Sequence, residues 1–453
     1  MTRYLAPLLL LGLAVPLLAQ DPGATVPRDD AKRGGSANIR LVAHVENNAG
    51  AWKAADIEME QDAGRPYVYV SGFVNNNFQV YDVRNEQAPK LLLNWTIENP
   101  ELHQGIGAMD GKYFKLGDRY FYVQSFQFAQ GGPDSDLGAI VFDVTGLPDP
   151  AAVREVARIR YAPSPGGFHN IFAYKHSSGR VLLFTTIGGD RALVYDLGRV
   201  VAGGDPASWL VGEVPNPTPM AQLGASGYHD FYVGYDVARR RDVFYGAGLG
   251  GYSAWDVSAP EAPSQLFTIT SLGMDLAHTF TPSPDGNIAV TETEYQYTPL
   301  RIWDLTEGQD GRRQNLDIPL SAWTADWRDL SHNHEVRWPF VFVSAYEDGF
   351  FVFNLTDPKH PKTEGWYYTC QCTHEHGFGG GPNVGWESTT SVMQGGFGVD
   401  VRNRDGLIVL SDMRTGLWLF RMDGFSGWNG ASVGMPNISS VQDYDRGPAP
   451  SSR

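Results

Sequence analysis

Cysteine is scarce in this chain of 453 residues, which contains only Cys370 and Cys372. The chain can therefore form at most one internal disulfide. Positive charge is also in deficit, because 35 Lys and Arg residues stand against 51 Asp and Glu residues, for a formal net charge of −16. A protein with this balance repels phosphates, so we expect no nucleic acid among its partners.

Long apolar runs are absent except at the N-terminus. There, Arg3 precedes the apolar run Leu5–Leu18, and the small residue Ala19 follows it. This run is too short to span a bilayer comfortably and has the layout of a secretory signal peptide. We predict a signal peptide over residues 1–19 and a flexible leader over residues 20–37.

Export follows from this prediction, and we expect a secreted or periplasmic protein with no membrane span. The predicted C-terminal tail, residues 425–453, carries no hydrophobic anchor, so we expect the protein to be soluble. In an oxidising compartment Cys370 and Cys372 can pair with each other, unless a metal holds them.

The sequence is rich in turn-forming and aromatic residues and contains an internal repeat. It has 52 Gly, 29 Pro and 12% aromatic residues, a mixture that favours short strands joined by tight turns. One unit recurs seven times: an alternating apolar strand, a short turn, and a second strand that usually ends in an apolar–Asp–apolar triplet. The copies occupy residues 65–83, 118–144, 180–197, 241–257, 286–305, 339–355 and 406–422.

Each repeat is flanked by two further strands. One precedes it, as at residues 168–175, and one follows it in six of the seven copies. The missing seventh strand is supplied by NIRLVAHV at residues 38–45. These strands predict an all-β fold, a seven-bladed β-propeller over residues 38–424 in which the N-terminal strand closes the last blade.

Two segments carry a resemblance to a known repeat. PFVFVSAYEDGFFVFNLTDPKHP (339–361) and AWDVSAPEAP (254–263) resemble the LVIVD repeat. The whole arrangement resembles the choice-of-anchor B family of exported bacterial proteins. The resemblance implies the propeller fold, and it implies no particular activity.

Four histidines open the predicted inner strands of blades 3 to 6. They are His169, His229, His278 and His332. Inner strands line the central channel of a propeller, so these residues are expected around its upper mouth, and similar His-Asn or His-Asp pairs recur in the choice-of-anchor B pattern. Neutral imidazole is the commonest metal ligand, and several converging imidazoles suit Cu or Zn. We predict a transition-metal site at these four residues; the alternative is that the histidines only cap strands and bond neighbouring blades.

Other residues could complete or gate this site. The additional candidates are His103, His334, Cys370, Cys372, His374, His376, Glu294 and Asp348. Four of them lie in TCQCTHEHG (369–377), which is predicted to begin a long top loop. Alternate residues of an extended segment share one face, which would suit a soft metal such as copper. A small-ring disulfide between the two cysteines remains open as the alternative.

Two classes of function follow. The first is a metalloenzyme, either a metal-dependent oxidoreductase or a hydrolase, in which the metal activates water or takes part in redox chemistry. Its architecture is similar to that of the selenium-binding-type methanethiol oxidases, propellers whose histidines hold copper, although no sequence motif matches. The second is a non-enzymatic propeller that binds a small molecule or a protein at its top face. A calcium-dependent, lactonase-like site would need oxygen ligands to dominate, whereas histidines do here.

Overall fold

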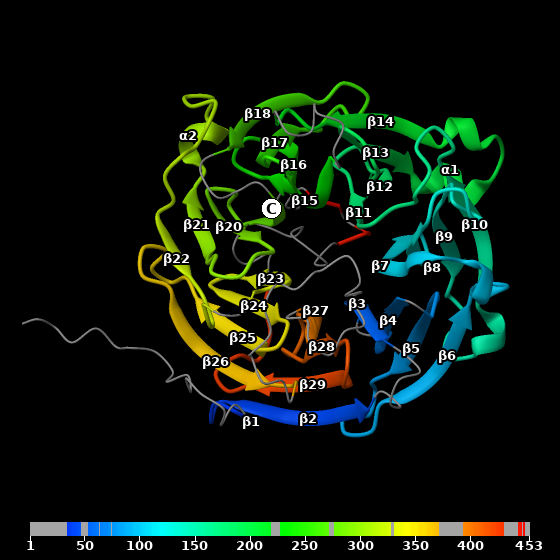
Figure 1. The fold of residues 1–453 in the computed structure, drawn as a ribbon, viewed down its shortest axis with the longest axis horizontal. Helices are drawn as coiled ribbons and strands as arrows, with labels where there is room; N and C mark the ends of the chain where they lie inside the picture. The colour runs from blue at the N-terminus through cyan, green and yellow to red at the C-terminus, as the bar shows by residue number, and fades with distance from the viewer. Residues whose placement is uncertain are drawn as a thin grey trace, which may run out of the picture.

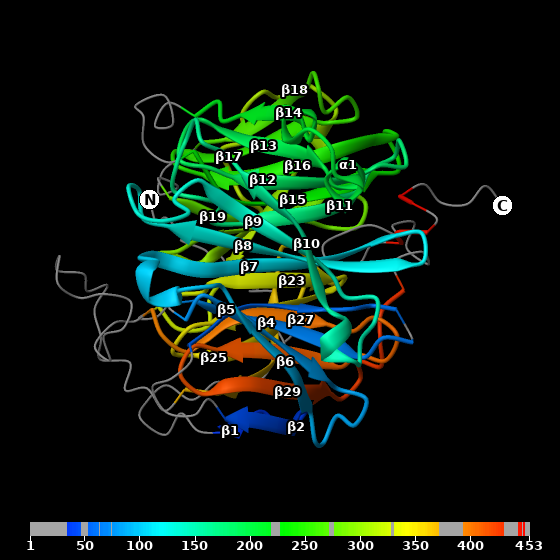
Figure 2. The same ribbon diagram turned by 90° about the vertical axis from the view of Figure 1, so that its right-hand side faces the viewer.

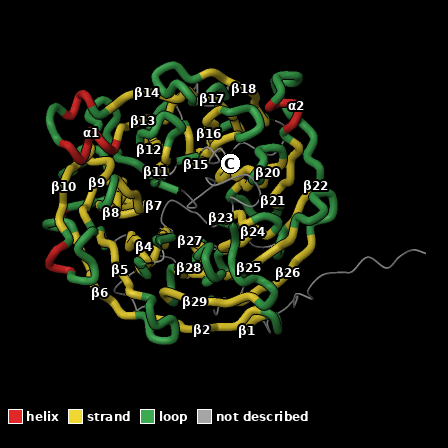
Figure 3. The backbone as a smooth tube through the Cα atoms, turned by 180° about the vertical axis from the view of Figure 1, so that it is seen from behind, coloured by secondary structure: helices red, strands yellow, loops and turns green. Residues whose placement is uncertain are grey.

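Seven blades, each of four antiparallel strands, surround a central axis in the computed structural model (Figure 1, Figure 3). The structure describes residues 34–46, 53–62, 64–73, 75–218, 227–270, 276–327, 330–370, 393–429, 443–445 and 447–448. The prediction of an all-β, seven-bladed β-propeller is confirmed.

Each blade is built from an inner strand outward. The inner strands of blades 1 to 7 are β3 (Lys53–Met59), β7 (Gly105–Leu116), β11 (Ile171–Lys175), β15 (Tyr228–Asp236), β19 (Ala277–Pro282), β23 (Asn333–Arg337) and β27 (Gly396–Val401). The second strands are β4 (Tyr67–Phe73), β8 (Arg119–Phe128), β12 (Val181–Thr186), β16 (Arg241–Gly248), β20 (Ile288–Thr293), β24 (Phe340–Ala345) and β28 (Ile408–Asp412).

The two outer strands complete each blade. The third strands are β5 (Asn77–Asp82), β9 (Leu137–Asp143), β13 (Arg191–Asp196), β17 (Gly251–Asp256), β21 (Leu300–Asp304), β25 (Gly349–Asn354) and β29 (Gly416–Met422). The outermost strands are β6 (Lys90–Thr96), β10 (Arg154–Arg160), β14 (Leu210–Pro215), β18 (Ser264–Ile269), β22 (Ser321–Trp323), β26 (Lys362–Tyr368) and β2 (Ile39–Glu46). Two short helices, α1 (Leu197–Ala202) and α2 (Thr306–Gln309), follow the third strands of blades 3 and 5.

The N-terminal strand closes the ring, as predicted. β2 pairs with β29 from Ile39↔Met422 to Glu46↔Gly416, and the two strands lie side by side although they come from opposite ends of the chain (Figure 1). The His44 ring stacks on Trp418 with 3.7 Å between ring centroids. A further pair of residues, β1 (Gly34–Gly35), adds to the outer edge of blade 6 by pairing with β26.

Apolar side chains fill the spaces between neighbouring blades. Strand β12 (VLLFTT) is buried along its whole length because blades cover both of its faces. Phe184 of blade 3 and Phe244 of blade 4, for example, belong to one core cluster, and their ring centroids lie 5.7 Å apart. Buried layers of this kind fix the inner strands rigidly around the axis, and so they fix whatever side chains these strands present there.

A C-terminal segment, described at residues 443–445 and 447–448, packs across the bottom of blades 2 and 3, opposite the end at which the inner strands begin. The Tyr444 hydroxyl donates to the carbonyl oxygens of Tyr113 at 3.0 Å and Ala173 at 3.4 Å. Asp445 forms an ion pair with Lys115 at 2.7 Å. Residues 443–445 and 447–448, drawn in red, therefore lie on one face of the disc, as the side view shows (Figure 2). No helix in the described part of the chain is long and apolar enough to cross a membrane.

Candidate metal centre

The inner strands share an irregularity at their upper ends. Five of them have a register shift there, located at Ala55–Asp56, Met109–Asp110, His229, His278 and Phe397. In blades 3 and 6 the corresponding residues, His169 and His332, come just before the inner strand. A β-bulge breaks the strict alternation of side chains and re-aims them, so two consecutive residues can both face the axis.

Two layers of side chains result from this irregularity. The upper layer contains Ala55, Met109, His169, His229, His278, His332 and Phe397. The lower layer contains the residues that follow them, Asp56, Asp110, Asn170, Asp230, Thr279, Asn333 and Gly398. Members of the upper layer line one cavity, and members of the lower layer line another.

The four predicted histidines lie next to one another in the upper layer. Ring centroids are 4.5 Å apart between His169 and His229, 4.3 Å between His229 and His278, and 4.8 Å between His278 and His332. We call these four residues the histidine arc. Four imidazoles from four consecutive blades are thus in contact at the mouth of the channel.

Hydrogen bonds fix the ring orientation at both ends of the arc. The Nδ1 atom of His332 lies 2.6 Å from the carbonyl oxygen of Phe397. The Nδ1 atom of His169 lies 2.7 Å from Oε1 of Gln127. Both oxygens can only accept, so Nδ1 carries the proton in each ring and Nε2 is left with a lone pair. A metal-binding histidine is typically held in this way by its second nitrogen.

The middle of the arc contains nitrogens without partners. His278 Nδ1 bonds to Thr279 Oγ1 at 2.8 Å, and its Nε2 atom is buried with no hydrogen-bond partner. His229 Nδ1 is likewise buried without a partner. A buried polar atom without a partner costs free energy and calls for an explanation, such as an ion that the protein binds.

Glu294 supplies a carboxylate beside the unpartnered nitrogen. Its Oε2 atom lies 3.6 Å from His278 Nε2, and its Oε1 atom accepts a hydrogen bond from the Tyr346 hydroxyl at 2.5 Å. One ligand atom from each of His229, His278 and Glu294 lies within 4.8 Å of the other two. Ligands about 2.1 Å from a tetrahedral metal lie roughly 3.4 Å from each other, so a modest side-chain movement would close this triad on an ion.

Burial keeps the arc neutral. It lowers the pKa of His169 to about 4 and that of His332 to about 3. The pKa of His229 and of His278 is held well below the ordinary value, first by burial and then by the neighbouring histidines. Burial raises the pKa of Glu294 to about 8, against the opposing effect of the Tyr346 hydrogen bond. Neutral imidazoles are the form that binds metal, and a cation would in turn favour ionised Glu294.

The other side of the upper layer is apolar. Ile106, Met109 and Phe397, which we call the apolar wall, line a cavity of about 10 Å³, roughly the room of one water molecule, together with His169, His229, His332 and Glu294. Met109 and Phe397 belong to a buried cluster that also contains Ala55, Tyr346 and Met413. The cavity therefore has a polar, ligand-rich side formed by blades 3 to 6 and an apolar side formed by blades 2 and 7.

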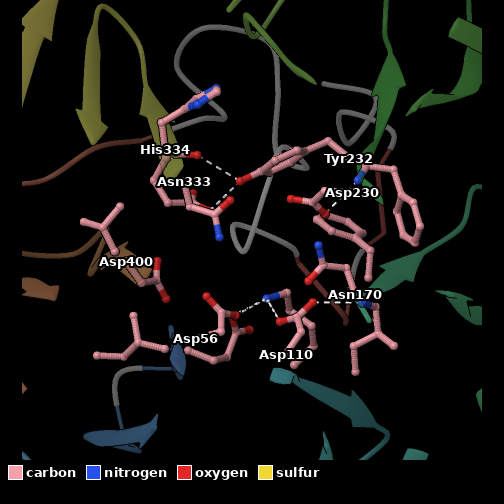
Figure 4. Close-up of a pocket in the computed structure, with 16 residues that line it drawn as sticks. Asp56, Asp110, Asn170, Asp230, Tyr232, Asn333, His334 and Asp400 are labelled. Carbon is pink, nitrogen blue, oxygen red and sulfur yellow. Dashed lines mark hydrogen bonds and ion pairs between the residues drawn. The ribbon is translucent and has the colours of Figure 1, made fainter. Parts of the chain in front are cut away.

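A second cavity, of about 40 Å³, lies on the axis below the arc (Figure 4). We call it the lower chamber, and its charged lining residues are Asp56, Glu58, Asp110, Lys112, Asp230, Glu335 and Asp400. Lys112 Nζ lies 2.6 Å from Asp110, 3.0 Å from Asp56 and 3.9 Å from Glu58. One ammonium group thus forms ion pairs with three carboxyl groups.

The carboxyl groups of the lower chamber have pKa values that are shifted in different directions. Burial raises the pKa of Asp56 and of Glu58 well above the ordinary value, although Lys112 acts in the opposite direction. Burial would also raise the pKa of Asp110, but Lys112 and the Ile171 N–H outweigh it and hold that pKa below the ordinary value. The three carboxylates raise the pKa of Lys112 against the effect of burial. We therefore expect the ion pair of Lys112 and Asp110 to persist at neutral pH.

Two of the additional predicted ligands point elsewhere. Both ring nitrogens of His103 are engaged, Nδ1 with the Asn99 carbonyl and Nε2 with Asp134, each at 3.0 Å. The blade 2 residue that occupies the upper layer is Met109. The His334 ring points away from the lower chamber (Figure 4), and its Nδ1 atom bonds to Glu292 at 3.0 Å.

The remaining predicted ligands have other positions. Asp348 is buried in the turn between β24 and β25. Cys370 is 3% exposed and disulfide-bonded, and a disulfide sulfur is not the thiolate that metals bind. Cys372, His374 and His376 lie outside the described residues.

The apolar wall and the lower chamber were not predicted from the sequence. A signal for both layers was present in the sequence. Met109–Asp110 and Ala55–Asp56 repeat the pattern of His229–Asp230, in which a residue of the upper layer is followed by an acidic one. Reading these pairs as one repeated position would have located both layers. Lys112 and Asp400 carry no such signal, because nothing in their local sequence distinguishes them.

Comparison with known proteins bears on the fold alone. No protein-family model and no curated protein matches the chain. Among solved structures, the crystal structure of Raptor from Chaetomium thermophilum is similar, with a TM-score of 0.57 and 11% sequence identity over 86% of this chain. The match covers 30% of the Raptor chain, so this protein spans less than a third of that length. At this identity the likeness is one of fold and carries no activity.

Proposed function

We propose that this protein is an exported metal-dependent enzyme with a single transition-metal centre at the upper mouth of its propeller. His229, His278 and Glu294 form the core of the centre, and His169 and His332 complete it from either side. The observation that carries the proposal is the unpartnered, buried Nε2 atom of His278, which lies 3.6 Å from a carboxylate and within an arc of neutral imidazoles. An arrangement that served only to cap strands would be expected to satisfy that nitrogen.

The ligand set narrows the choice of metal. Imidazole suits Zn, Cu and Fe, and Cu or Zn fits a centre that uses the four histidines. Two histidines and one carboxylate with open positions are typical of non-haem Fe(II) centres, which makes iron the alternative for the triad. When bound, such a metal activates a water molecule or takes part in redox chemistry.

The residues around the centre favour oxidoreductase over hydrolase chemistry. A hydrolase needs donors that stabilise the charge developing on its substrate, and it needs a place for the attacking water. The apolar wall, Ile106, Met109 and Phe397, offers no side-chain hydrogen-bond donor on the side facing the arc. Hydrolysis is the second candidate, since a bound Zn or Cu ion can activate a water molecule at a position that the protein ligands leave open.

Membership of a family and export belong to the same proposal. The repeats at residues 254–263 and 339–361 support placing the chain with the LVIVD-repeat, choice-of-anchor B proteins. Residues 1–19, which lie outside the described residues, support a secreted or periplasmic location. Detection of the mature chain, cleaved near Ala19, in a periplasmic or culture fraction would test this part.

Metal content tests the central part of the proposal. The untagged protein should be produced with its signal peptide and measured by inductively coupled plasma mass spectrometry for Cu, Zn and Fe. We expect about one ion per chain in the wild type and none in a His229→Ala/His278→Ala variant. A His103→Ala/His360→Ala variant is the matched control, because it removes two histidines whose side chains lie away from the arc.

Two results would overturn the proposal. One is the absence of metal from the exported wild type, both as purified and after incubation with each ion. The other is equal metal content in the arc variant and the control. In either case the arc is structural or contacts an organic ligand, and the binding of a small molecule or protein at the top face becomes the leading hypothesis.

A further inference from the structure

The C-terminal segment, residues 443–445 and 447–448, reaches the inner strands of blades 2 and 3 from below. The Tyr444 hydroxyl donates to the carbonyl oxygen of Tyr113 in β7 and to that of Ala173 in β11. Because one hydroxyl reaches both strands, the Tyr444 side chain lies between them. The segment, drawn in red, is found inside the ring of blades (Figure 1). It therefore enters the ring from the bottom face and does not lie on the outer surface of a blade.

Tyr444 lies directly beneath the lower chamber. Its two acceptors are the residues that follow Lys112 and Phe172, and both Lys112 and Phe172 line the chamber. Tyr444 is itself buried, and burial raises the pKa of its hydroxyl well above the ordinary value. Two charged residues of the chamber also act on that pKa, since Glu58 raises it and Lys112 lowers it. The hydroxyl thus borders the charged lining of the chamber.

Charge complementarity holds the segment in place. The chain has a formal net charge of −16, yet the acidic residues of the segment meet lysines. Asp445 forms an ion pair with Lys115 at 2.7 Å, and Asp443 and Asp445 raise the pKa of Lys175 against the larger, opposing effect of burial. The Asp445 side chain is 62% exposed, so water and salt weaken its ion pair. We therefore expect the segment to leave its site without unfolding of the blades.

We infer that the docked segment is a removable plug of the lower chamber, and that its release opens the chamber to water and small solutes from the bottom face. The chamber has a volume of about 40 Å³ and a polar lining, so it has room for a few water molecules. The upper layer leaves only about 10 Å³, and a solute larger than water therefore finds little passage from above. Release of the plug does not depend on whether a metal occupies the arc.

Three lysines can report separately on docking and on access to the chamber. Lys112 lines the chamber, whereas Lys115 and Lys175 face the acidic residues of the segment and do not line it. Formaldehyde and a borohydride methylate the amino groups that they reach, and peptide mass spectrometry gives the rate at each lysine. The ion pairs of Lys112 are present in every protein compared, so a change in its rate measures access.

Two shortened chains form the matched comparison. One ends after residue 442 and lacks the docked residues, and the other ends after residue 448 and keeps them. We expect Lys112 to be methylated at least about tenfold faster in the first protein than in wild type, because no segment has to be displaced before the reagent enters. The second protein should behave as wild type does. Lys90, which is exposed on the outer strand β6, should react at the same rate in all three.

Two further measurements assign the effect to Tyr444. Tyr444→Ala keeps the rest of the segment and removes the side chain between the strands, so Lys112 should again react faster than in wild type. This variant decides by itself if the chain that ends after residue 442 does not fold. A synthetic peptide of residues 440–453, added to that shortened protein, should restore slow methylation of Lys112, and the same peptide with Tyr444→Ala should not.

Three results would overturn the plug. Faster methylation of Lys115 and Lys175 without any change at Lys112 would show that the segment covers only the bottom surface. Equal rates at all three lysines in wild type and in the protein that ends after residue 442 would show that the segment is not docked in solution. Methylation of Lys112 in wild type as fast as that of Lys90 would show that the chamber is open with the segment in place.

Discussion

His278 donates a hydrogen bond from Nδ1 to the hydroxyl oxygen of Thr279, its neighbour in the chain, at 2.8 Å. The Thr279 hydroxyl donates onward to Oδ1 of Asn333 in the next blade at 3.1 Å. Because the hydroxyl proton is already used, Thr279 must accept from His278, which places the imidazole proton on Nδ1. Thr279 and Asn333 of the lower layer thus fix the tautomer of His278 in the upper layer. The Nε2 atom of His278 then carries no proton and faces Glu294.

Thr279→Val is expected to weaken metal binding by about 10- to 100-fold, the usual range for loss of a residue that orients a ligand. Valine keeps the shape of threonine but cannot accept the Nδ1 proton. Competition with a chromophoric chelator measures the affinity, and Thr279→Ser, which keeps a hydroxyl, is the control. Equal affinity of the Val and Ser variants would show that this hydrogen bond does not orient the ligand.

The metal-free protein should lose stability between pH 7 and pH 5 because of the arc. His169 and His332 have pKa values of about 4 and about 3 in the folded state, whereas an unfolded histidine titrates near 6.5. As the pH falls through 6.5 the unfolded chain takes up protons that the native chain does not, so the stability present above pH 6.5 is lost toward pH 4. The expected loss by pH 5 is about 2 kcal/mol per histidine.

Urea unfolding at pH 7 and pH 5 can measure this loss. A His169→Gln/His332→Gln variant should show a smaller decrease than wild type, by about 4 kcal/mol for the pair. Other groups that titrate in this range, including the Glu294 carboxyl, remain in both proteins and cancel in the comparison. Identical decreases in the two proteins would mean that the arc is not held neutral by burial.

Lys112→Met should destabilise the protein strongly. It removes the ammonium group that faces Asp110, Asp56 and Glu58 in the lower chamber, and loss of one partner of a buried ion pair costs roughly 3–5 kcal/mol. Adding Asp110→Asn should recover part of this loss, because the most strongly ionised carboxyl then carries no charge. Unfolding free energies of the three proteins form the test, and a Lys112→Met variant as stable as wild type would contradict it.

Tyr444 should anchor the C-terminal segment to the bottom of the propeller. Tyr444→Phe removes only the hydroxyl that donates to the carbonyl oxygens of Tyr113 and Ala173, and about 1 kcal/mol of unfolding free energy should be lost. Tyr444→Ala also removes the ring, which packs edge-on against Tyr113, and should cost more. An Ala variant with the stability of wild type would show that the docked segment adds nothing to the fold.

The fold could be read from the sequence because its signals are local and repeated. Alternating strands ending in aromatic or apolar–Asp–apolar triplets identified the repeat, and the unmatched strand at residues 38–45 identified the closure with β29. The grouping of His169, His229, His278 and His332 could be read for the same reason. Each opens an inner strand, and equivalent positions of a closed ring must meet at its axis.

The β-bulges determine which residues of each inner strand face the axis, and the sequence could not predict this. Alternation along a strand predicts that neighbours point to opposite faces, so it separates Met109 from Asp110, and it gives no reason to prefer Met109 over His103 as the blade 2 member of the ring. The register shifts in the structure turn both residues of the pair toward the axis and form the two layers. Lys112, Asp400 and Tyr346 reach their positions through contacts between blades that no local pattern records.

The sequence by itself therefore determined the seven blades, the closing strand and the identity of the four imidazoles, because periodicity and repetition are properties of the chain. Only the tertiary structure decided that His278 faces Glu294, that three residues of blades 2 and 7 form an apolar wall, and that Lys112 holds three carboxylates below the arc. These contacts join residues far apart in the chain. Their distances are set by how the blades pack around a shared axis, which no single segment encodes.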